Sequence, residues 1–359
     1  MKRNSILVAL IFLFAISFGQ STVFIEAESF ANKGGWFVDQ QFMDIMGSSY
    51  LLAHGMGVPV ANAETEVEFP ENGDYHVYVR TFNWTSVWQK GEGPGKFNLL
   101  VDGKNVGSVL GASGSEWIWQ FAGKVKISNK KSKIALHDLT GFNGRVDAIY
   151  FSKENTPPPS DVAELDKFRK QQPGVEQEPE DAGKFDLVVI GGGVAGTTAS
   201  ISAARLGLKV ALIHDRPVLG GNNSSEVRVH LGGRIKVEPY PALGDVVNEI
   251  GPSRGGNAQP AEYYEDEKKM EMLLAEENIT LFANFRAFAV KMDDSKITEV
   301  VARNIETSRE MVFSAPLFAD CTGDGTIGYL AGADYSMGRE SKAEFGEVTA
   351  PEVADKMTM

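Results

Sequence analysis

The sequence predicts two folded domains, an all-β sandwich or jelly roll followed by an α/β domain. Short runs of alternating apolar residues, separated by turn signals, recur over residues 22–152. A glycine-rich motif between two apolar runs occupies residues 186–213. The segment between these regions, residues 153–184, is acidic and contains three consecutive prolines, so it is interpreted as a linker. A length of 359 residues suits two or three domains.

The composition is that of a globular protein, with 43% hydrophobic and 23% charged residues. The formal net charge of −13 argues against nucleic acid and against anionic membrane surfaces as partners. Cys321 is the single cysteine of the sequence, which excludes an internal disulfide, a thiolate metal cage and an iron–sulfur cluster held by cysteines.

The first 20 residues have the pattern of a signal peptide. Lys2 and Arg3 precede an apolar core from Ile6 to Phe18, which is too short to span a bilayer comfortably. No other run approaches the roughly 18 apolar residues of a transmembrane helix. The sequence therefore predicts export to the periplasm or the medium without stable membrane insertion, with a retained N-terminal anchor as the alternative.

The predicted sandwich covers residues 22–152. Its strand candidates include TVFIEAESF, TEVEFPENGDYHVYVRTF, KFNLLVDGKNV, SKIALHDL and VDAIYFS, and Asn-Gly or Asp-Gly pairs at 72–73, 102–103 and 143–144 predict turns between strands. Evenly spaced short strands of this kind are typical of sandwiches and jelly rolls.

Four short motifs in this region resemble carbohydrate-binding modules of the galactose-binding-like jelly-roll class. They are FIEAE at 24–28, GGW at 34–36, GDY at 73–75 and RVDAI at 145–149. The resemblance implies a structural calcium ion held by Glu26, Glu28 and Asp147, whose carboxylate oxygens suit that cation. The alternative is that these are ordinary surface acids.

The same resemblance implies a sugar-binding surface, because an exposed indole can stack on a pyranose ring. Tryptophans also fill cores, so about half of those in this region are expected to be buried. The candidates are Trp36, Trp84, Trp88, Trp117 and Trp119. A scaffold that no longer binds sugar is the alternative.

Within the predicted linker, Asp161 is expected to cap a short helix that reaches Gln171. Beyond it, Leu187–Ile190 and Lys209–Ile213 are predicted as buried parallel strands, joined by a helix over 194–206 that Gly207 ends. This is a βαβ crossover of Rossmann type with a G-x-G-x-x-G motif at its first turn, the context that dinucleotide binding requires.

Each glycine of that motif has a physical role. Gly191 permits the tight turn out of the strand, Gly193 lets a pyrophosphate approach the backbone, and Gly196 lets the helix lie close to the sheet. The N-terminus of the helix offers free N–H groups and a positive dipole end to phosphate. A glycine-rich turn without a ligand is the alternative.

Three separated motifs extend this interpretation: VVIGGGVAG, LIHDRPVLGGNNSSEVRVHLGG and LFADCTGDG at 317–325. Together they resemble the FAD-dependent oxidoreductases often met in Bacteroidetes, whose flavin domain is similar to that of heterodisulfide-reductase A-like flavoproteins. The resemblance implies an FAD-binding Rossmann-like domain over 185–359 and hydride transfer between flavin and a small-molecule or glycan-derived substrate. Only about 35 residues follow the last motif. We therefore expect a domain that is truncated at its C-terminus, in a fragment of a longer protein.

The family pattern places an acid at the end of the second strand to hold ribose hydroxyls, but His214 occupies that position and Asp215 follows it. NAD in place of FAD is therefore an alternative. Arg216 is expected over the adenosine or, alternatively, as a solvated surface arginine. The resemblance implies further cofactor contacts at Gly220, Gly221, Asn222, Ser224, Ala287, Thr322, Gly323 and Asp324. For Asp324 the alternative is a helix cap.

Arg228 and His230 lie two residues apart and would share a face if the segment is extended. A cation near the flavin can stabilise its reduced anion, and histidine is the usual proton carrier near neutral pH. These two residues are the catalytic candidates, with a salt bridge for Arg228 and a structural role for His230 as alternatives.

Residues 232–260 indicate no chemistry. A helix is predicted from Ala261 to Glu277, a strand from Ile279 to Met292, and two further strands over 297–305 and 310–320. Two other functions stay open: a polysaccharide-binding protein with a structural or vestigial FAD fold, and a flavin-containing polysaccharide lyase-like enzyme. No Tyr/His/Arg constellation specifies the latter.

Overall fold

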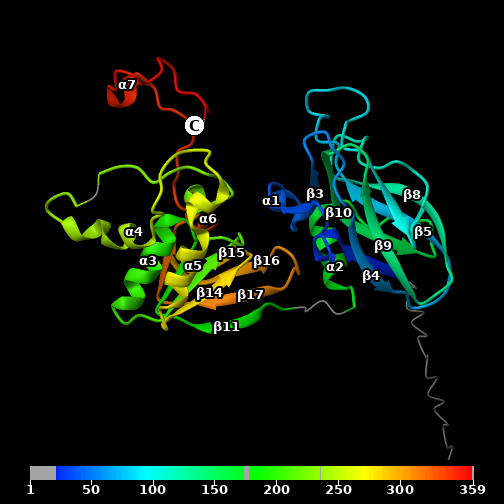
Figure 1. Ribbon diagram of the computed structural model, residues 1–359, viewed down its shortest axis with the longest axis horizontal. Helices are drawn as coiled ribbons and strands as arrows, with labels where there is room; N and C mark the ends of the chain where they lie inside the picture. Colours follow the sequence, from blue (N-terminus) through cyan, green and yellow to red (C-terminus); the bar gives the residue numbers. More distant parts are fainter. Residues whose placement is uncertain (1–21, 174–177, 235, 358–359) are drawn as a thin grey trace, which may run out of the picture. The chain divides into compact units, whose positions relative to one another are not determined.

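The computed structural model describes residues 22–173, 178–234 and 236–357. The chain divides into two compact units, each described by itself below (Figure 1). The first contains the chain up to Asp39 and Ser49–Phe168, and the second contains Gln40–Ser48 and the chain from Arg169 onward. The predicted signal peptide lies outside the described residues. Within the described ranges no helix is both long and apolar enough to cross a membrane.

The first unit consists of two antiparallel sheets. The larger has the strand order β2-β3-β10-β5-β8, with β1 also paired to β10, and the smaller has the order β4-β9-β6-β7. The strands of the larger sheet are β1 (Thr22–Glu26), β2 (Trp36–Asp39), β3 (Tyr50–His54), β5 (Gly73–Thr81), β8 (Ile118–Ile127) and β10 (Phe142–Ser152); those of the smaller are β4 (Ala63–Glu68), β6 (Phe97–Val101), β7 (Lys104–Asn105) and β9 (Lys131–Asp138).

Both sheets contribute to one hydrophobic core, so the unit is a β-sandwich. Alternation along the strands produces this core. In strand β6, for example, Phe97, Leu99 and Val101 belong to the core and alternate with less buried residues. Asp102 and Gly103 have φ values of 49° and 77° between β6 and β7, the left-handed conformation that the Asp-Gly pair predicted for a hairpin turn. A short 3-10 helix (Ala27–Ser29) follows β1. The jelly-roll assignment stays a prediction.

The predicted linker is partly folded. Helix α2 (Val162–Lys170) begins as expected at Asp161, whose Oδ1 accepts hydrogen bonds from the N–H groups of Ala163 and Glu164, both at 3.0 Å. The predicted end of the linker is wrong, because Glu180–Lys184 forms strand β11 and pairs in parallel with β17 (Glu310–Ser314). No run of apolar residues marks β11, so its sequence resembled a loop.

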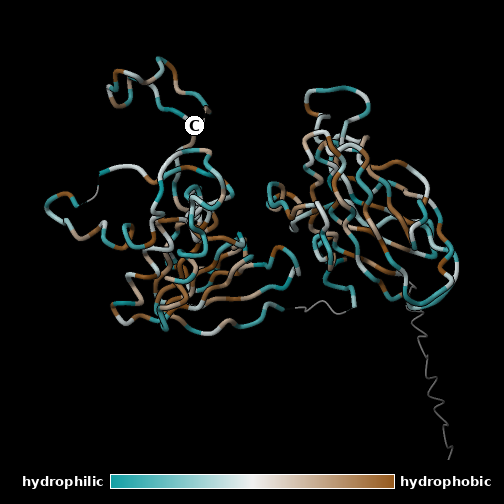
Figure 2. The backbone as a smooth tube through the Cα atoms, viewed as in Figure 1, coloured by the Kyte–Doolittle hydropathy of each residue, from teal (hydrophilic) through white to brown (hydrophobic). Residues whose placement is uncertain are grey.

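The second unit contains a parallel sheet with the strand order β14-β13-β12-β18. Its residues are mostly apolar, and Figure 2 shows hydrophobic residues concentrated along the strands while hydrophilic ones occupy many connecting loops. One face packs against helices in a core that includes Val189, Ile201, Leu212 and Leu273. The elements are β12 (Leu187–Ile190), α3 (Val194–Arg205), β13 (Val210–His214), α4 (Asp245–Ile250), α5 (Asp266–Leu274), β14 (Ile279–Ala283) and β18 (Leu317–Asp320). The βαβ crossover is therefore confirmed.

The other face of this parallel sheet packs against a second sheet, with the order β11-β17-β16-β15. Ile190 and Ile213 meet Val300 and Phe313 in the core between them. The strands are β15 (Phe285–Asp293) and β16 (Lys296–Asn304), besides β11 and β17. The remaining helical segments are α1 (Met43–Met46), α6 (Thr326–Leu330), α7 (Lys342–Phe345) and the 3-10 turns Gly221–Asn223, Pro241–Gly244 and Ala261–Tyr264.

Three predicted elements differ from the structure. The strand expected over 279–292 is two strands in different sheets, because Asn284, with φ of 62°, turns the chain from β14 into β15. The strand expected over 310–320 likewise divides into β17 and β18. The helix expected from Ala261 is a 3-10 turn followed by α5, because Glu265, with φ of 45°, interrupts it.

Candidate functional site

A cavity of about 580 Å³ opens at the carboxyl ends of β12, β13 and β18. This is the edge at which open α/β sheets bind their ligands, and the volume lies in the range of small-molecule sites. Twelve of the predicted site residues line the cavity. They are Gly191, Gly193, Asp215, Arg216, Gly220, Gly221, Asn222, His230, Ala287, Thr322, Gly323 and Asp324.

The turn from β12 into α3 depends on two of its glycines for packing. Gly191 has φ of 102°, and a Cβ there would lie 2.2 Å from the carbonyl oxygen of Cys321. A Cβ on Gly196 would lie 1.8 Å from the carbonyl oxygen of Gly191. Gly196 does not line the cavity, so its role is to let α3 approach the turn.

Gly193 is different, because a Cβ at this position would meet no atom within 4 Å. It lies directly before α3, and Gly193, Val194 and Ala195 all line the cavity. The backbone is therefore open to a ligand at the end of the helix where N–H groups lack helical partners.

The buried side chain of His214 stabilises this turn through hydrogen bonds to the backbone. The N–H of Gly192 donates to its Nδ1 at 3.0 Å, and its Nε2 lies 2.8 Å from the carbonyl oxygen of Val218. Since a backbone N–H can only donate and a carbonyl can only accept, the ring is neutral with its proton on Nε2. Burial lowers the pKa of His214, which agrees with this state. Asp215, half-buried at the cavity, stays available at the position predicted for ribose.

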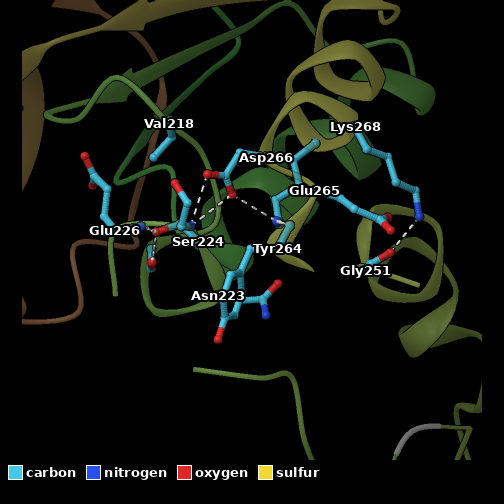
Figure 3. A network of polar contacts seen from close by, with 12 residues as sticks. Val218, Asn223, Ser224, Glu226, Gly251, Tyr264, Glu265, Asp266 and Lys268 are labelled. Carbon is cyan, nitrogen blue, oxygen red and sulfur yellow. Dashed lines mark hydrogen bonds and ion pairs between the residues drawn. The ribbon is translucent and has the colours of Figure 1, made fainter. Parts of the chain in front are cut away.

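The loop after β13 returns to the glycine turn. The N–H of Gly220 donates to the carbonyl oxygen of Gly192 at 2.8 Å. Ser224 is buried and its Oγ donates to the carbonyl oxygen of Gly221 at 2.7 Å, so it holds the loop and does not line the cavity. The N–H of Ser225 donates to both carboxylate oxygens of Asp266, at 3.2 and 3.0 Å (Figure 3).

Lys269 on α5 braces the same loop. Its side chain is fully buried, its Nζ donates to the carbonyl oxygen of Tyr264, and it lies 3.4 Å from Asp266 Oδ1. A Cβ on Gly220 would lie 3.0 Å from both Cδ and Cε of Lys269. Burial lowers the pKa of this ammonium group. No sequence signal distinguished Lys269 from its neighbour Lys268.

Asn223 lines the cavity and is 2% exposed. Its Nδ2 donates to the carbonyl oxygen of Val229 at 3.0 Å, whereas its Oδ1 is a buried acceptor without a partner among the described residues. A buried acceptor left unpaired is costly, so it favours a ligand that donates there.

The two catalytic candidates separate. His230 lines the cavity and is exposed, but Arg228 does not line it. Arg228 has φ of 65°, which breaks the extended conformation expected for the segment, and its Nε donates to the carbonyl oxygen of Ser225 at 2.8 Å. The expectation that both side chains share one face is therefore wrong.

Arg216 and Ala287 both line the cavity but come from different elements, the loop after β13 and strand β15. Arg216 lines the cavity, and its Nη1 lies 3.3 Å from Glu226 Oε2. Ala287, on β15, brings the second sheet to the cavity together with Phe285 and Arg286. The charge of Arg216 is thus partly met by a surface carboxylate.

The turn after β18 is organised by Asp320. Its Oδ1 accepts from the N–H and hydroxyl of Thr322, at 3.1 and 2.7 Å, and its Oδ2 from the N–H groups of Ile327 and Gly328, at 2.8 and 3.1 Å. Burial acts to raise the pKa of Asp320, but these hydrogen bonds outweigh it and hold the pKa below its usual value. Asp320 therefore caps α6, and Asp324 is left exposed at the cavity.

In the first unit, the acids predicted for calcium do not form a ligand cluster. Asp147 Oδ2 lies 2.8 Å from Arg80 Nη1 in a buried ion pair, and Glu28 is buried. In the described part of the chain there is no group of three or more His, Cys, Asp or Glu side chains placed to hold a metal ion. The calcium site at Glu26, Glu28 and Asp147 stays a prediction without a preformed cluster.

The tryptophans of this unit divide between core and surface. Trp36 and Trp117 are buried, whereas Trp88 is 67% exposed. Trp84 packs edge-on against Trp88, with ring centroids 5.4 Å apart. Trp119 packs against Phe24 and Tyr150.

The cavity has the features that a flavin dinucleotide requires. Open backbone at Gly193 and Gly323 admits phosphate, the start of α3 supplies N–H groups, and Asn223 offers an unpaired buried acceptor. The three motifs that contribute to its lining lie at 188–196, 212–233 and 317–325. Comparison with known families agrees: residues 186–359 match the family described as FAD dependent oxidoreductase.

The matched segment lies wholly in the second unit and covers just under half of the chain. Glycerol-3-phosphate dehydrogenase of Mycobacterium leprae is 46% identical over 50 residues, which are 14% of this chain and 8% of that protein. Fumarate reductase (cytochrome) of Shewanella frigidimarina is 45% identical over 62 residues, 17% of this chain and 10% of that protein. The aligned segments thus span a tenth or less of the length of these curated relatives.

Solved structures show only a weak likeness. The 3-ketosteroid-delta4-(5alpha)-dehydrogenase of Rhodococcus jostii RHA1 has a TM-score of 0.30 and 14% identity over 38% of this chain and 47% of that chain. The glycerol-3-phosphate dehydrogenase of Bacillus halodurans complexed with FAD has a TM-score of 0.30 and 13% identity over 42% of this chain and 37% of that chain.

Proposed function

We propose that the chain is an FAD-dependent oxidoreductase that transfers hydride between flavin and a small-molecule or glycan-derived substrate. One observation carries the proposal: the glycine turn, the Gly220–Gly221 loop and the turn at Thr322–Asp324 converge on one cavity, in a domain that matches the FAD dependent oxidoreductase family. Bound FAD would supply the two-electron chemistry.

The chain's own residues would bind and orient the cofactor. The turn at Gly191–Gly193 and the start of α3 would face the pyrophosphate, and Asp215 would accept from ribose hydroxyls. Asn222, Ala287 and Asp324 line the rest of the cavity as candidate contacts. Ser224 and Gly196 support the site from outside it.

His230 is the proposed proton carrier, because it is the histidine that is both exposed and part of the cavity lining among the described residues. Arg228 is not proposed as a catalytic residue, since its side chain does not reach the cavity.

The test is anaerobic bleaching of the flavin absorption after reconstitution with FAD, screened against sugars, sugar acids and polyols. We expect at least one compound to bleach the flavin in the wild-type protein and to bleach it more slowly in His230→Gln. An FAD-loaded protein that no compound reduces, although dithionite does, would contradict hydride transfer. It would favour a structural or vestigial flavin, or the lyase-like alternative.

A second proposed function belongs to the first unit, which we propose binds a polysaccharide through Trp84 and Trp88. Trp88 is 67% exposed, and Trp84 is held by its Nε1–H donating to the carbonyl oxygen of Phe142 at 3.1 Å and by Arg145 above its ring, with Cζ 5.5 Å from the centroid. A fixed indole beside an exposed one is a surface on which pyranose rings can stack.

Affinity electrophoresis on a panel of soluble polysaccharides tests this second function. We expect retardation by at least one polysaccharide, lost in Trp88→Ala and retained in Val87→Ala, whose side chain is 71% exposed on the same loop. Equal retardation of the two variants would contradict the assignment. Export, which the N-terminal residues predict, is also part of this proposal, and a cell-fractionation assay would test it.

A further inference from the structure

We propose that Asn257 is a positioning residue that fixes the His230 ring in one tautomer, with an unprotonated Nε2 for the cavity. This inference rests on the proposed function, because it assigns His230 the task of taking a proton from a molecule in the cavity. Asn257 lies in the segment 232–260, in which the sequence indicated no chemistry.

The tautomer follows from two contacts to the same oxygen. The backbone N–H of His230 donates to Asn257 Oδ1 at 2.9 Å, and His230 Nδ1 lies 2.8 Å from that same atom. Since a backbone N–H can only donate, the facing side-chain atom of Asn257 must be its carbonyl oxygen. Nδ1 must then donate as well, so it carries the ring proton of the neutral imidazole.

This arrangement leaves Nε2 as the nitrogen with a lone pair. Nε2 makes no hydrogen bond to any residue that the structure describes, and His230 lines the cavity. The buried His214 has the opposite tautomer, with both ring nitrogens occupied by backbone groups. Of these two histidines at the cavity, only His230 can therefore accept a proton without losing an existing contact.

Hydrogen bonds also hold residues 256–258, here called the Asn257 turn, against residues 228–230. The N–H of Ala258 donates to the carbonyl oxygen of Arg228 at 2.8 Å. Tyr264 is 2% exposed, and its hydroxyl lies 2.6 Å from the carbonyl oxygen of Arg228 and 3.0 Å from that of Gly256. The left-handed backbone of Arg228 thus turns its carbonyl toward this anchor, and the Asn257 amide is placed before any ligand binds.

The proton transfer balances without a further reactant. An O–H or N–H bond of the substrate breaks, the proton bonds to Nε2, and the electron pair stays on the substrate oxygen or nitrogen. The ring becomes an imidazolium with both nitrogens protonated, and Asn257 Oδ1 still accepts from Nδ1. Orientation of a base by a second hydrogen-bonded group is a general way of preparing such a transfer.

Nuclear magnetic resonance of protein labelled with ¹⁵N-histidine tests the tautomer without any substrate. The His230 signals are assigned by their loss in His230→Gln. We expect the Nδ1–H form in the wild type, a mixture of tautomers in Asn257→Leu, and the Nδ1–H form in Asn257→Asp, which keeps the acceptor. Asn248→Leu, at an exposed position on α4, is the matched control and should leave the signals unchanged. An Nε2–H form in the wild type, or an unchanged tautomer in Asn257→Leu, would overturn the proposal.

Diethyl pyrocarbonate, which attacks unprotonated imidazole nitrogen, tests whether Nε2 faces the cavity. Mass spectrometry should find His230 modified at Nε2 in the apoprotein and at least tenfold more slowly with FAD bound, while His214 stays unmodified. Equal rates with and without bound FAD would overturn the placement of Nε2. A protein that fails to bind FAD would instead contradict the proposed function, which the tautomer measurement does not depend on.

Discussion

At the scale of single residues, each glycine of the motif has a role that depends on which atoms a Cβ at its position would meet. Gly196 has a backbone oxygen where its Cβ would be, whereas Gly193 has open space. The G-x-G-x-x-G spacing predicted both roles. It could not predict that His214, at the position expected for an acid, would hold the turn through two backbone groups, because those partners are set by tertiary structure.

Gly193→Ala should therefore weaken FAD binding without affecting folding. The added methyl group meets no protein atom within 4 Å but lies at the cavity, so we expect about a tenfold rise in Kd, equivalent to about 1.4 kcal/mol. Fluorescence titration with FAD measures it. Gly196→Ala is the matched variant and should destabilise the apoprotein by about 1–3 kcal/mol through overpacking. Equal losses of stability in the two variants would contradict the distinction.

His214 should make stability depend on pH. Burial lowers its folded pKa below the unfolded value of about 6.5, so the unfolded state binds the proton first as pH falls. Its contribution is complete above about pH 6.5 and is lost below it, by up to about 1.4 kcal/mol per pH unit. Urea unfolding from pH 7.5 to 5 should show a shallower slope in His214→Gln than in the wild type. The same pH dependence of the free energy of unfolding in His214→Gln and in the wild type would refute this role.

At the scale of elements, local patterns predicted the βαβ crossover but not the partners of later strands. Leu187–Ile190 and Val210–Ile213 are continuous apolar runs of strand length, so their sequence is sufficient to predict β12 and β13. Between Ile279 and Met292 the apolar pattern continues across Asn284, although the chain changes sheets there. The periodicity of apolar residues predicts which residues of a strand are buried, but it does not predict which sheet the strand joins.

Helix α5 should stabilise the cofactor loop through Lys269. Replacing this buried lysine in Lys269→Met leaves the carbonyl of Tyr264 and the carboxylate of Asp266 without their cation, at a cost of about 2 kcal/mol. We expect a lower Tm and faster hydrogen exchange at Ser225, whose N–H binds Asp266. Lys296→Met, at the exposed first residue of β16, should change neither. A wild-type Tm in Lys269→Met would show that the brace is dispensable.

In the turn after β18, we expect Asp320 to contribute to stability and Asp324 to contribute to FAD binding. Asp320→Asn disturbs an acceptor of four hydrogen bonds and should lower apoprotein stability by about 1–2 kcal/mol, as loss of a helix cap does. Asp324→Asn, at an exposed carboxylate on the cavity, should leave the Tm unchanged and weaken FAD binding several-fold. Calorimetry and FAD titration on both variants check this, and the reverse pattern would mean that the two roles are exchanged.

At the scale of the whole molecule, composition and motif order predicted a β-rich unit followed by a dinucleotide-binding one. They predicted twelve of the residues that line the cavity, because glycine spacing and strand ends are local features. They did not separate Arg228 from His230, since the left-handed backbone at Arg228 is supported by Tyr264 and the Asn257 turn, 28 or more residues away in the chain. Long-range anchors of this kind have no local signature.

The measurement that bears most directly on the function is FAD uptake by the purified, folded protein. We predict a flavin absorption spectrum that persists through gel filtration at one FAD per chain, and a weaker retention in Gly193→Ala, with unchanged circular dichroism. A folded wild-type protein that elutes colourless after incubation with excess FAD would contradict the assignment of the cavity, and with it the proposed oxidoreductase.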